Sequence, residues 1–348
     1  MNGTAGQNKT CNPLFWLGVV VLLFLLTAPY LLPLIVEDFW VTVLAEIFIW
    51  GLFAASVNLL FGYTGLLSFG QAVYFGMGAY GVALGIDLLG FAFWPAFFFG
   101  VAVALVTAVV TGFFAVRLTW HYFAIITVVL SLIFYFIAVG WKDLTGGDDG
   151  LPFTLAPVFK WGELELSLSD LTFQYYFMLV IVSACFYLLY RVLQSPLGQA
   201  LAAVRENDSR ASLIGLSPYW IRYSSFVLAG GFAGVAGMLF ALFGRYATAQ
   251  YMFWTVSGEG VIWMIVGGAR TLFGPALGAA FLIILREELS LYWEHYLLVV
   301  GAIVILTVTF APQGIMGLLH KWIARMTAGA PMVEPEAKIS KQPGESLE

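Results

Sequence analysis

The chain has 348 residues, of which 61% are hydrophobic and 10% are charged, and its formal net charge is −5 at pH 7. Soluble domains hold about 45–50% apolar and about 25% charged residues, so this composition excludes a water-soluble globular protein. The absence of a basic patch excludes a nucleic-acid partner. The two cysteines, Cys11 and Cys185, give neither a disulfide framework nor the spacing of metal ligands.

Apolar stretches between turn signals predict membrane-spanning helices, each of which needs about 20 residues to cross the lipid. We predict an all-α integral membrane protein, a polytopic bundle of about 10 (8–10) transmembrane helices surrounded by lipid. The lower number applies if the eighth and ninth stretches, which are short and interrupted by glycine and proline, are broken or re-entrant. The ten stretches are Leu14–Val36, Trp40–Phe61, Gln71–Ile86, Phe93–Val116, His121–Gly140, Thr172–Tyr190, Tyr219–Phe243, Trp254–Val266, Ala276–Leu285 and His295–Ala311.

The charges between these stretches indicate the orientation, because Lys and Arg concentrate in short cytoplasmic loops. The connection 194–218 contains Arg205 and Arg210 and is predicted to be cytoplasmic, which places the acidic loop 141–170 outside and both termini inside. The acidic loop fits either a docking surface for a soluble partner or an ordinary solvated loop. The expected organisation is a cytoplasmic segment 1–13, a transmembrane domain 14–320 and a disordered cytoplasmic tail 321–348.

The segment Gly62–Gly81, GYTGLLSFGQAVYFGMGAYG, is dense in glycine, which allows helices to approach closely or the chain to break within the membrane. Close packing alone does not explain Ser68 and Gln71, two polar residues beside a predicted helix start. Their desolvation must be offset by a partner or a substrate.

Polar residues inside the predicted spans are candidates for a substrate pathway. Glu46 and Glu259 are the embedded acids, with Asn58 and Gln250 as neutral companions. Structural hydrogen bonding within the bundle is the alternative role for each of them. We predict that Ser68, Gln71 and Glu259 line the pathway.

Five further blocks follow in the chain. The cytoplasmic connection Ser195–Tyr223 has the pattern of a short interfacial helix with a glycine stop at Gly215. The other blocks are Arg117–Ile126 (RLTWHYFAII), Leu144–Leu151 (LTGGDDGL) and the pair Gly267–Gly278 (GGARTLFGPALG) and Ala311–Leu318 (APQGIMGL).

Together these blocks resemble, in family order, the permeases of ABC importers for branched-chain amino acids, and in particular their M-type inner-membrane subunit. The resemblance extends over roughly Trp40 to Leu318. In the first block it rests on a glycine, an aromatic residue, a glycine and a Leu-Ser-x-Gly-[His or Gln] run before a glycine-rich helix. The matching residues are Gly62, Tyr63, Gly65, Leu67, Ser68, Gly70, Gln71, Gly76, Gly78, Ala79 and Tyr80.

In such importers the connection 194–218 holds the coupling helix, which docks into a groove of the ATPase. The resemblance therefore implies that ATPase coupling involves Arg205, Glu206, Asn207, Ala211 and Gly215. The wider importer motif Glu-Ala-Ala-x-x-x-Gly appears here as Ser209, Arg210 and Ala211 before Gly215, so its acidic residue is missing at that register.

The resemblance also implies the partners: a second homologous permease subunit, two cytoplasmic ATPase subunits and a periplasmic substrate-binding protein. The setting would be the bacterial inner membrane. No phosphate-binding loop of the type Gly-x-x-x-x-Gly-Lys-Ser/Thr occurs in the chain. We therefore expect a transport subunit that is not an enzyme and binds no cofactor, with ATP hydrolysed by its partners.

Two alternatives remain open from the residues, and a third, an enzyme, fails. A permease of the same family for urea or short amides fits the same motifs. A stand-alone secondary transporter would need paired embedded charges and inverted repeats, and the halves of the chain show no such repeat. An intramembrane enzyme would need a catalytic constellation on adjacent helices, which the sequence lacks.

Overall fold

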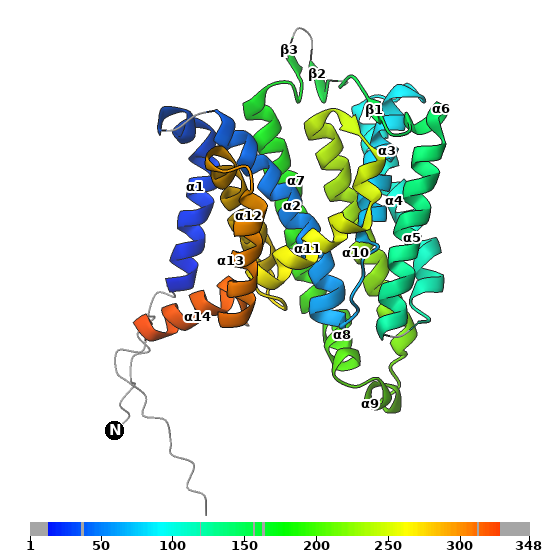
Figure 1. Cartoon of the computed structure of the whole chain (residues 1–348), viewed down its shortest axis with the longest axis vertical. Coiled ribbons are helices and arrows are strands. Elements are labelled where there is room, and N and C mark those ends of the chain that lie inside the picture. Colours follow the sequence, from blue (N-terminus) through cyan, green and yellow to red (C-terminus); the bar gives the residue numbers. More distant parts are fainter. Residues whose placement is uncertain are drawn as a thin grey trace, which may run out of the picture.

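The computed structural model describes residues 13–35, 38–118, 120–155, 157–161, 164–311 and 313–327 (Figure 1). Within these ranges the chain forms a bundle of helices with two small β-ribbons. The helices before the middle connection are α1 (Pro13–Ile35), α2 (Phe39–Asn58) with its π-helical continuation η1 (Leu59–Thr64), α3 (Gln71–Asp87), α4 (Phe93–Ala115), α5 (Trp120–Gly140), α6 (Lys142–Thr145) and α7 (Leu171–Gln194).

The second part of the chain contains more short elements than the first. Its helices are α8 (Pro196–Glu206), α9 (Asp208–Leu213), α10 (Pro218–Gly244), the 3-10 helix η2 (Ala249–Met252), α11 (Trp254–Gly267), α12 (Gly274–Tyr292), α13 (Tyr296–Phe310) and α14 (Gly314–Thr327). The strands are β1 (Leu151–Pro152), β2 (Phe159–Trp161), β3 (Leu164–Leu166) and β4 (Tyr246–Ala247), and they pair antiparallel as β1 with β4 and β2 with β3.

Each of the ten predicted spans falls on a helix, so the all-α membrane fold class is confirmed. Within the described residues, five segments are long and apolar enough to cross a membrane alone, and α13 with α14, bent by 53°, would make a sixth. The helices α3 and α11 have only 17 and 14 residues. The number of about ten crossings therefore stays a prediction. The five long segments are Phe39–Thr64, Phe93–Ala115, His121–Gly140, Leu171–Gln194 and Pro218–Gly244.

The centre of the bundle is formed by α2, α3, α4 and α10, where glycines allow the backbones to approach closely. A Cβ atom on Gly78 of α3 would clash with the carbonyl oxygen of Gly234 of α10. A Cβ on Gly81 would lie 2.7 Å from the Cα of Gly100 in α4. At the flank, α13 has no buried residue among those described. Tight packing is thus concentrated around α3.

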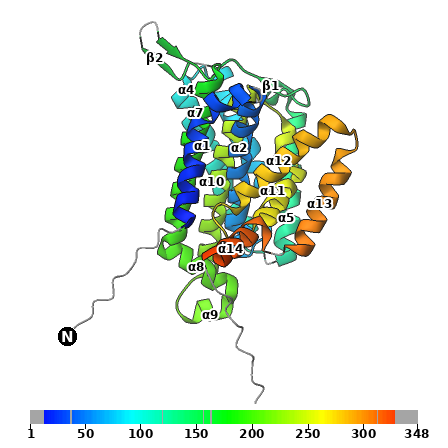
Figure 2. The same ribbon diagram turned by 90° about the vertical axis from the view of Figure 1, so that its left-hand side faces the viewer.

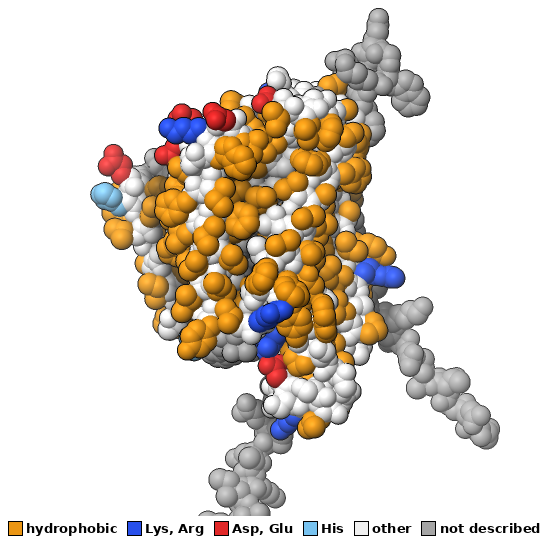
Figure 3. Space-filling model, turned by 90° about the vertical axis from the view of Figure 1, so that its right-hand side faces the viewer, with side chains coloured by type: hydrophobic (Ala, Val, Ile, Leu, Met, Phe, Trp, Pro, Cys, Tyr) orange, Lys and Arg blue, Asp and Glu red, His pale blue; other side chains and the backbone are white. Residues whose placement is uncertain are grey.

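Apolar side chains cover the middle of the face shown in Figure 3, and charged side chains are sparse there. The ribbons β1 to β4 lie at one end of the bundle, whereas α8, α9 and α14 lie at the other (Figures 1 and 2). This arrangement agrees with the predicted alternation of the loops. The assignment of one end to the cytoplasm stays a prediction.

Two segments differ from the expected organisation. The middle connection holds two short helices, because Asn207 adopts an extended conformation (φ −163°, ψ 112°) that ends α8 and begins α9. The helix α14 runs to Thr327, so residues 321–327, which were predicted to begin the disordered tail, are helical. The pattern of α14 is amphipathic, which suits a surface helix. The rest of the tail and the segment 1–12 lie outside the described residues.

Candidate functional site

The α2–α3 connection returns from one end of the bundle to its middle. After η1, Gly65 adopts a left-handed conformation (φ +81°) that glycine tolerates without strain, and the chain then runs to the start of α3 at Gln71. Side chains alternate along this segment, as expected for an extended chain: Leu66 and Ser68 are buried, whereas Leu67 and Phe69 are half-exposed. One edge of the connection therefore faces the core and the other faces outward.

The α10–α11 connection approaches the same place. It runs through β4 and η2 and begins α11 at Trp254. The backbone N–H of Ala72 at the start of α3 donates a hydrogen bond to Ser257 Oγ of α11, with an N···O distance of 2.8 Å. The rings of Phe69 and Trp254 meet edge to face with centroids 6.4 Å apart. We call the place where α3 and α11 begin side by side the junction, defined by residues 65–72 and 249–258.

Hydrogen bonds to α5 fix the depth of the junction. The backbone N–H of Phe69 donates to Thr127 Oγ1 at 3.1 Å, and the hydroxyl of Ser131 donates to the carbonyl oxygen of Met252. Thr127 lies seven residues beyond Trp120, the first residue of α5, or about 10 Å along the helix axis. The junction is therefore well inside the membrane-spanning part of the bundle.

The structure brings two of the three predicted pathway residues to the junction. Ser68 is 1% exposed, and its Oγ accepts a hydrogen bond from the N–H of Gly70 at 3.2 Å. Gln71 is 0% exposed, and neither atom of its side-chain amide has a hydrogen-bond partner within the described residues. Both side chains face the core in this conformation. A buried amide without a partner carries a desolvation cost of about 1–3 kcal/mol, which a rearrangement of the junction would relieve.

The third predicted residue, Glu259, lies apart from Ser68 and Gln71. It is exposed, whereas Ser257 is buried, and two residues on a helix are about 200° apart around the axis. Glu259 interacts electrostatically with Arg286 of α12. It therefore belongs to the outward face of α11.

Arg286 also links the other embedded acid to this face. Its Nη2 lies 3.4 Å from Glu46 Oε1 of α2 and 3.0 Å from Oε1 of the neighbouring Glu287. Glu46 accepts a second hydrogen bond from Trp50 Nε1 at 3.0 Å. Glu46 thus takes part in hydrogen bonding between helices, the alternative that its position in a span had left open.

Sequence reasoning missed the aromatic residues of the junction. Phe69 and Trp254 are half-exposed or exposed at the starts of two short helices, but aromatic residues are common in any membrane span. The available signal was their position: each lies within two residues of a helix start that follows a glycine- or polar-rich segment.

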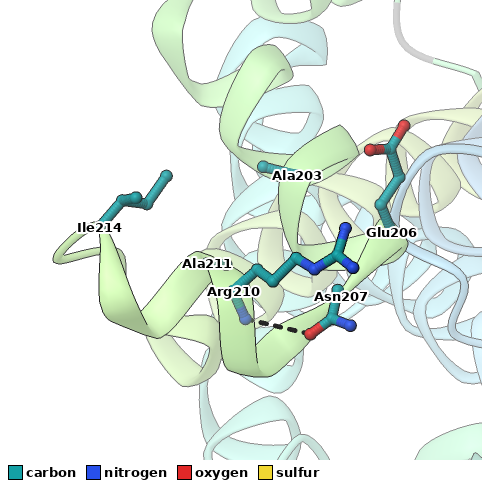
Figure 4. Close-up of a pocket in the computed structure, with 6 residues that line it drawn as sticks. All are labelled: Ala203, Glu206, Asn207, Arg210, Ala211 and Ile214. Atoms are coloured by element: carbon teal, nitrogen blue, oxygen red, sulfur yellow. Dashed lines mark hydrogen bonds between the residues drawn. The ribbon is translucent and has the colours of Figure 1, made fainter.

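The middle connection lies at the end of the bundle opposite the β-ribbons (Figure 1). Its two helices, α8 and α9, form a shallow surface pocket (Figure 4). Asn207 Oδ1 accepts a hydrogen bond from the N–H of Arg210 at 3.0 Å and so caps α9. Asp208 Oδ2 lies 2.6 Å from Arg222 Nη2, which fastens α9 to α10. The lining residues are Ala203, Glu206, Asn207, Arg210, Ala211 and Ile214.

The five predicted coupling residues divide into two groups. Glu206 and Asn207 are exposed beside the buried Ala211, and Gly215 ends α9 in a left-handed conformation (φ +85°) with open space around it. Arg205 instead turns inward, where its Cγ lies 3.2 Å from the position of a Cβ on Gly65. Glu206, Asn207 and Gly215 are available to a partner, whereas Ala211 packs inward. Arg205 joins α8 to the segment that leads to the junction.

Arg205 has an unusual environment for a cation. Its Nη1 atom is buried and has no hydrogen-bond partner within the described part of the chain. Burial, and to a lesser extent the nearby charge of Arg270, lower the pKa of its guanidinium from the ordinary value. Arginine does not lose its proton in proteins, so this buried group is a cation without a hydrogen-bond partner at Nη1 among the described residues.

The turn between α11 and α12 is tied to the same end of α2. Asn58 Oδ1 accepts a hydrogen bond from the N–H of Arg270 at 3.0 Å, and Asn58 Nδ2 donates to the carbonyl oxygen of Thr271 at 2.9 Å. The hydroxyl of Tyr63 donates to the carbonyl oxygen of Arg270 at 3.0 Å. Residues around η1 thus contact both α8 and the turn after α11.

Comparison with known proteins identifies the family. Residues 39–308 match the family described as the branched-chain amino acid transport system / permease component. The chain is 26% identical over 302 residues to the high-affinity branched-chain amino acid transport system permease protein LivM of Salmonella typhimurium, covering 81% of this chain and 68% of the relative. The Escherichia coli LivM protein matches with the same identity and coverage.

A third relative is the probable branched-chain amino acid transport permease protein LivH of Methanocaldococcus jannaschii, which is 29% identical over 183 residues, 48% of this chain and 56% of the relative. No solved structure matches the chain. Because the family match covers most of the chain, including the junction and the pair α8–α9, the chain is a multi-pass membrane protein that belongs to the branched-chain amino acid transport permease family.

Proposed function

We propose that the chain is the membrane-spanning permease subunit of an ATP-driven ABC importer that translocates branched-chain or related amino acids. A periplasmic binding protein delivers the substrate, and two cytoplasmic ATPase subunits supply the energy. A second homologous permease completes the membrane part. The family match and the names of the LivM relatives support the substrate class.

The junction is the observation that carries the transport role. Non-helical backbone within the hydrocarbon region is tolerated only where it is buried in protein or lines a water-filled path. Broken helices that begin near the middle of the membrane are the usual location of transporter substrate sites. In this chain residues 65–70 and 246–253 bring two such helix starts together. We place the substrate path along the outward edge of the junction, between this chain and the second permease.

Within this proposal the predicted pathway residues have different roles. Glu259 lines the path directly because its side chain is exposed on α11. Ser68 and Gln71 lie behind the path in the present conformation, and a shift of the junction would bring them to it. The exposed surface of α8–α9 with Glu206, Asn207 and Gly215 docks on an ATPase, the buried Ala211 packs beneath it, and Arg205 connects that surface to Gly65.

Co-purification followed by transport tests the proposal. The tagged chain is expressed together with its genomic neighbours, solubilised in detergent, purified and placed in vesicles with the binding protein. We expect an ATPase and a second permease to co-purify, and leucine uptake to depend on ATP. Recovery of the chain alone with ATP-independent transport would support a stand-alone secondary transporter instead. ATP-dependent uptake of urea or short amides, without leucine uptake, would show that these compounds, and not branched-chain amino acids, are the substrates.

A further inference from the structure

The outward face of the junction has an exposed stripe on α11. Trp254, Thr255, Glu259 and Ile262 are exposed; the last three lie on one side of the helix, and Trp254, at its first turn, lies at the edge of that side. Phe69 and Leu67 of the extended segment continue this surface. Since the backbone of 65–70 is not helical at this depth, lipid cannot cover it without leaving polar groups unsatisfied. The part of this surface formed by residues 65–70 must therefore face protein or water.

The aromatic pair Phe69 and Trp254 lies where the two irregular segments meet. The ring planes are inclined by 75°, with centroids 6.4 Å apart, and Trp254 is 38% exposed. Gly258, one turn beyond Trp254, has no side chain, and among the described residues outside its own helix the Phe69 ring lies nearest to the position of its Cβ, at 4.0 Å. The Phe69 ring is thus accessible from the side of α11, and both rings contribute apolar surface to the outward face.

The position of the pair is unusual for exposed aromatic residues in a membrane protein. Exposed Trp side chains concentrate at the two membrane–water interfaces, where the ring has both an apolar and a polar environment. Phe69 and Trp254 instead lie at the depth of Thr127 on α5. An aromatic pair on a wall that faces protein or water provides a contact for an apolar group within an otherwise wet path.

We propose that Phe69 and Trp254 form the specificity-determining constriction of the transport path, where they contact the apolar side chain of the amino-acid substrate. This inference rests on the proposed function and adds the substrate group that the permease itself recognises. An aliphatic side chain packs against the two rings, and a substrate with a smaller or polar side chain loses that contact.

Glu259, on the exposed side of α11, provides a comparison for the aromatic pair. It lies five residues beyond Trp254, or about 7.5 Å along the axis of α11. Its carboxylate interacts with the ammonium group that all amino acids share, so it does not distinguish their side chains. Substitution of Glu259 should therefore change the rates for all amino acids together, whereas substitution of the aromatic pair should change their ratio.

The test uses the complete transporter in vesicles, with the binding protein saturated in turn with leucine, valine and alanine. We compare the maximal uptake rates of the wild type with those of Phe69→Ala, Trp254→Ala and the milder Phe69→Leu and Trp254→Phe. The leucine-to-alanine ratio should fall by roughly tenfold in the alanine variants, the scale of discrimination by one or a few methylene groups. The milder variants should give a smaller fall in the same direction.

Two controls keep the result interpretable. Phe91→Ala removes one ring of a similar edge-to-face pair, Phe91 with Phe99, on the α3–α4 turn and should leave the ratio unchanged. Glu259→Gln should lower all three rates and preserve their ratio. An unchanged ratio in all four aromatic variants that assemble would overturn the proposal. A wild-type complex that transports no amino acid would instead reject the proposed function, so the two failures are distinguishable.

Discussion

The junction and the pair α8–α9 are both short breaks between long helices, but the structure holds them in different ways. The junction lies inside the bundle, with Ser68 and Gln71 fully buried and backbone hydrogen bonds to Thr127 and Ser257. The pair α8–α9 lies at the surface: α8 packs through the buried Leu201 and Val204, whereas α9 has one side-chain cap and one ion pair to α10. Changes in the junction should therefore damage assembly and the substrate path, whereas changes in α8–α9 should damage the connection to ATP hydrolysis.

The largest effect is expected for Gly70→Leu at the junction. A Cβ on Gly70 already lies 3.2 Å from both Cβ and the carbonyl oxygen of Thr127, so a leucine side chain does not fit without displacing α5. Overpacking of this kind costs about 1–3 kcal/mol. We expect loss of assembly or of uptake, measured by gel filtration and by uptake into vesicles. Gly140→Leu is the control because no described residue outside its own helix and its chain neighbours comes within 4 Å of its Cβ position. Equal behaviour of the two variants would mean that the contact of Gly70 with Thr127 is not critical.

A smaller and different effect is expected for Gly215→Pro at the end of α9. Proline cannot adopt the φ of +85° and lacks the N–H that Gly215 donates to the carbonyl oxygen of Ser212 at 3.0 Å. ATP hydrolysis by the assembled complex should continue while uptake falls by at least about tenfold, equivalent to about 1.4 kcal/mol. Asn tolerates the left-handed region, so Gly215→Asn should retain most of the uptake. Normal uptake by the proline variant would remove α9 from the coupling route.

Asp208→Asn should weaken the coupling of ATP hydrolysis to uptake by a few-fold. The substitution keeps the shape of the side chain and removes its charge from Arg222, which is 14% exposed while Asp208 is 43% exposed. Because the aspartate is partly solvated, we expect the interaction between Asp208 and Arg222 to weaken by about 1 kcal/mol. A double-mutant cycle with Arg222→Gln measures the interaction directly. A coupling energy near zero would show that this ion pair does not hold α9 to α10.

The smallest effect is expected for Asn207→Ala, which removes the cap of α9. Loss of such a cap costs about 1 kcal/mol and acts only on a six-residue helix. Amide hydrogen exchange in residues 208–213 should accelerate roughly fivefold, whereas Asn207→Asp should preserve the slow exchange. Unchanged exchange in the alanine variant would mean that contacts with α10 suffice to order α9.

Much of the fold could be predicted from the sequence because apolar stretches and turn residues mark the helices directly. Ser68 and Gln71 were found because polar residues beside a glycine-rich helix start are unusual in a membrane. Their burial could not be predicted, since it depends on which edge of an extended segment faces the core. The same limit applies to Arg205, whose inward orientation becomes visible only when Gly65 and Arg270 are placed beside it.

Glu259 and the aromatic pair show the complementary limit. Sequence position grouped Glu259 with Ser68 and Gln71, but the helix geometry of α11 places it on the opposite side from the buried Ser257. Phe69 and Trp254 are distinguished in the sequence only by their position beside a helix start, in a chain in which 17% of residues are aromatic. Their significance follows from two segments, about 185 residues apart in the chain, that meet at one depth.

Thiol labelling along residues 66–69 tests whether the outward edge of the junction lines a water-filled path. Leu66→Cys, Leu67→Cys, Ser68→Cys and Phe69→Cys are made one at a time in a chain without Cys11 and Cys185, assembled into the complex and treated with a membrane-impermeant thiol reagent. We expect labelling at positions 67 and 69, which face the water-filled path, and protection at positions 66 and 68, which face the core. Equal labelling at all four positions, or at none, would contradict a path along the outward edge of the junction.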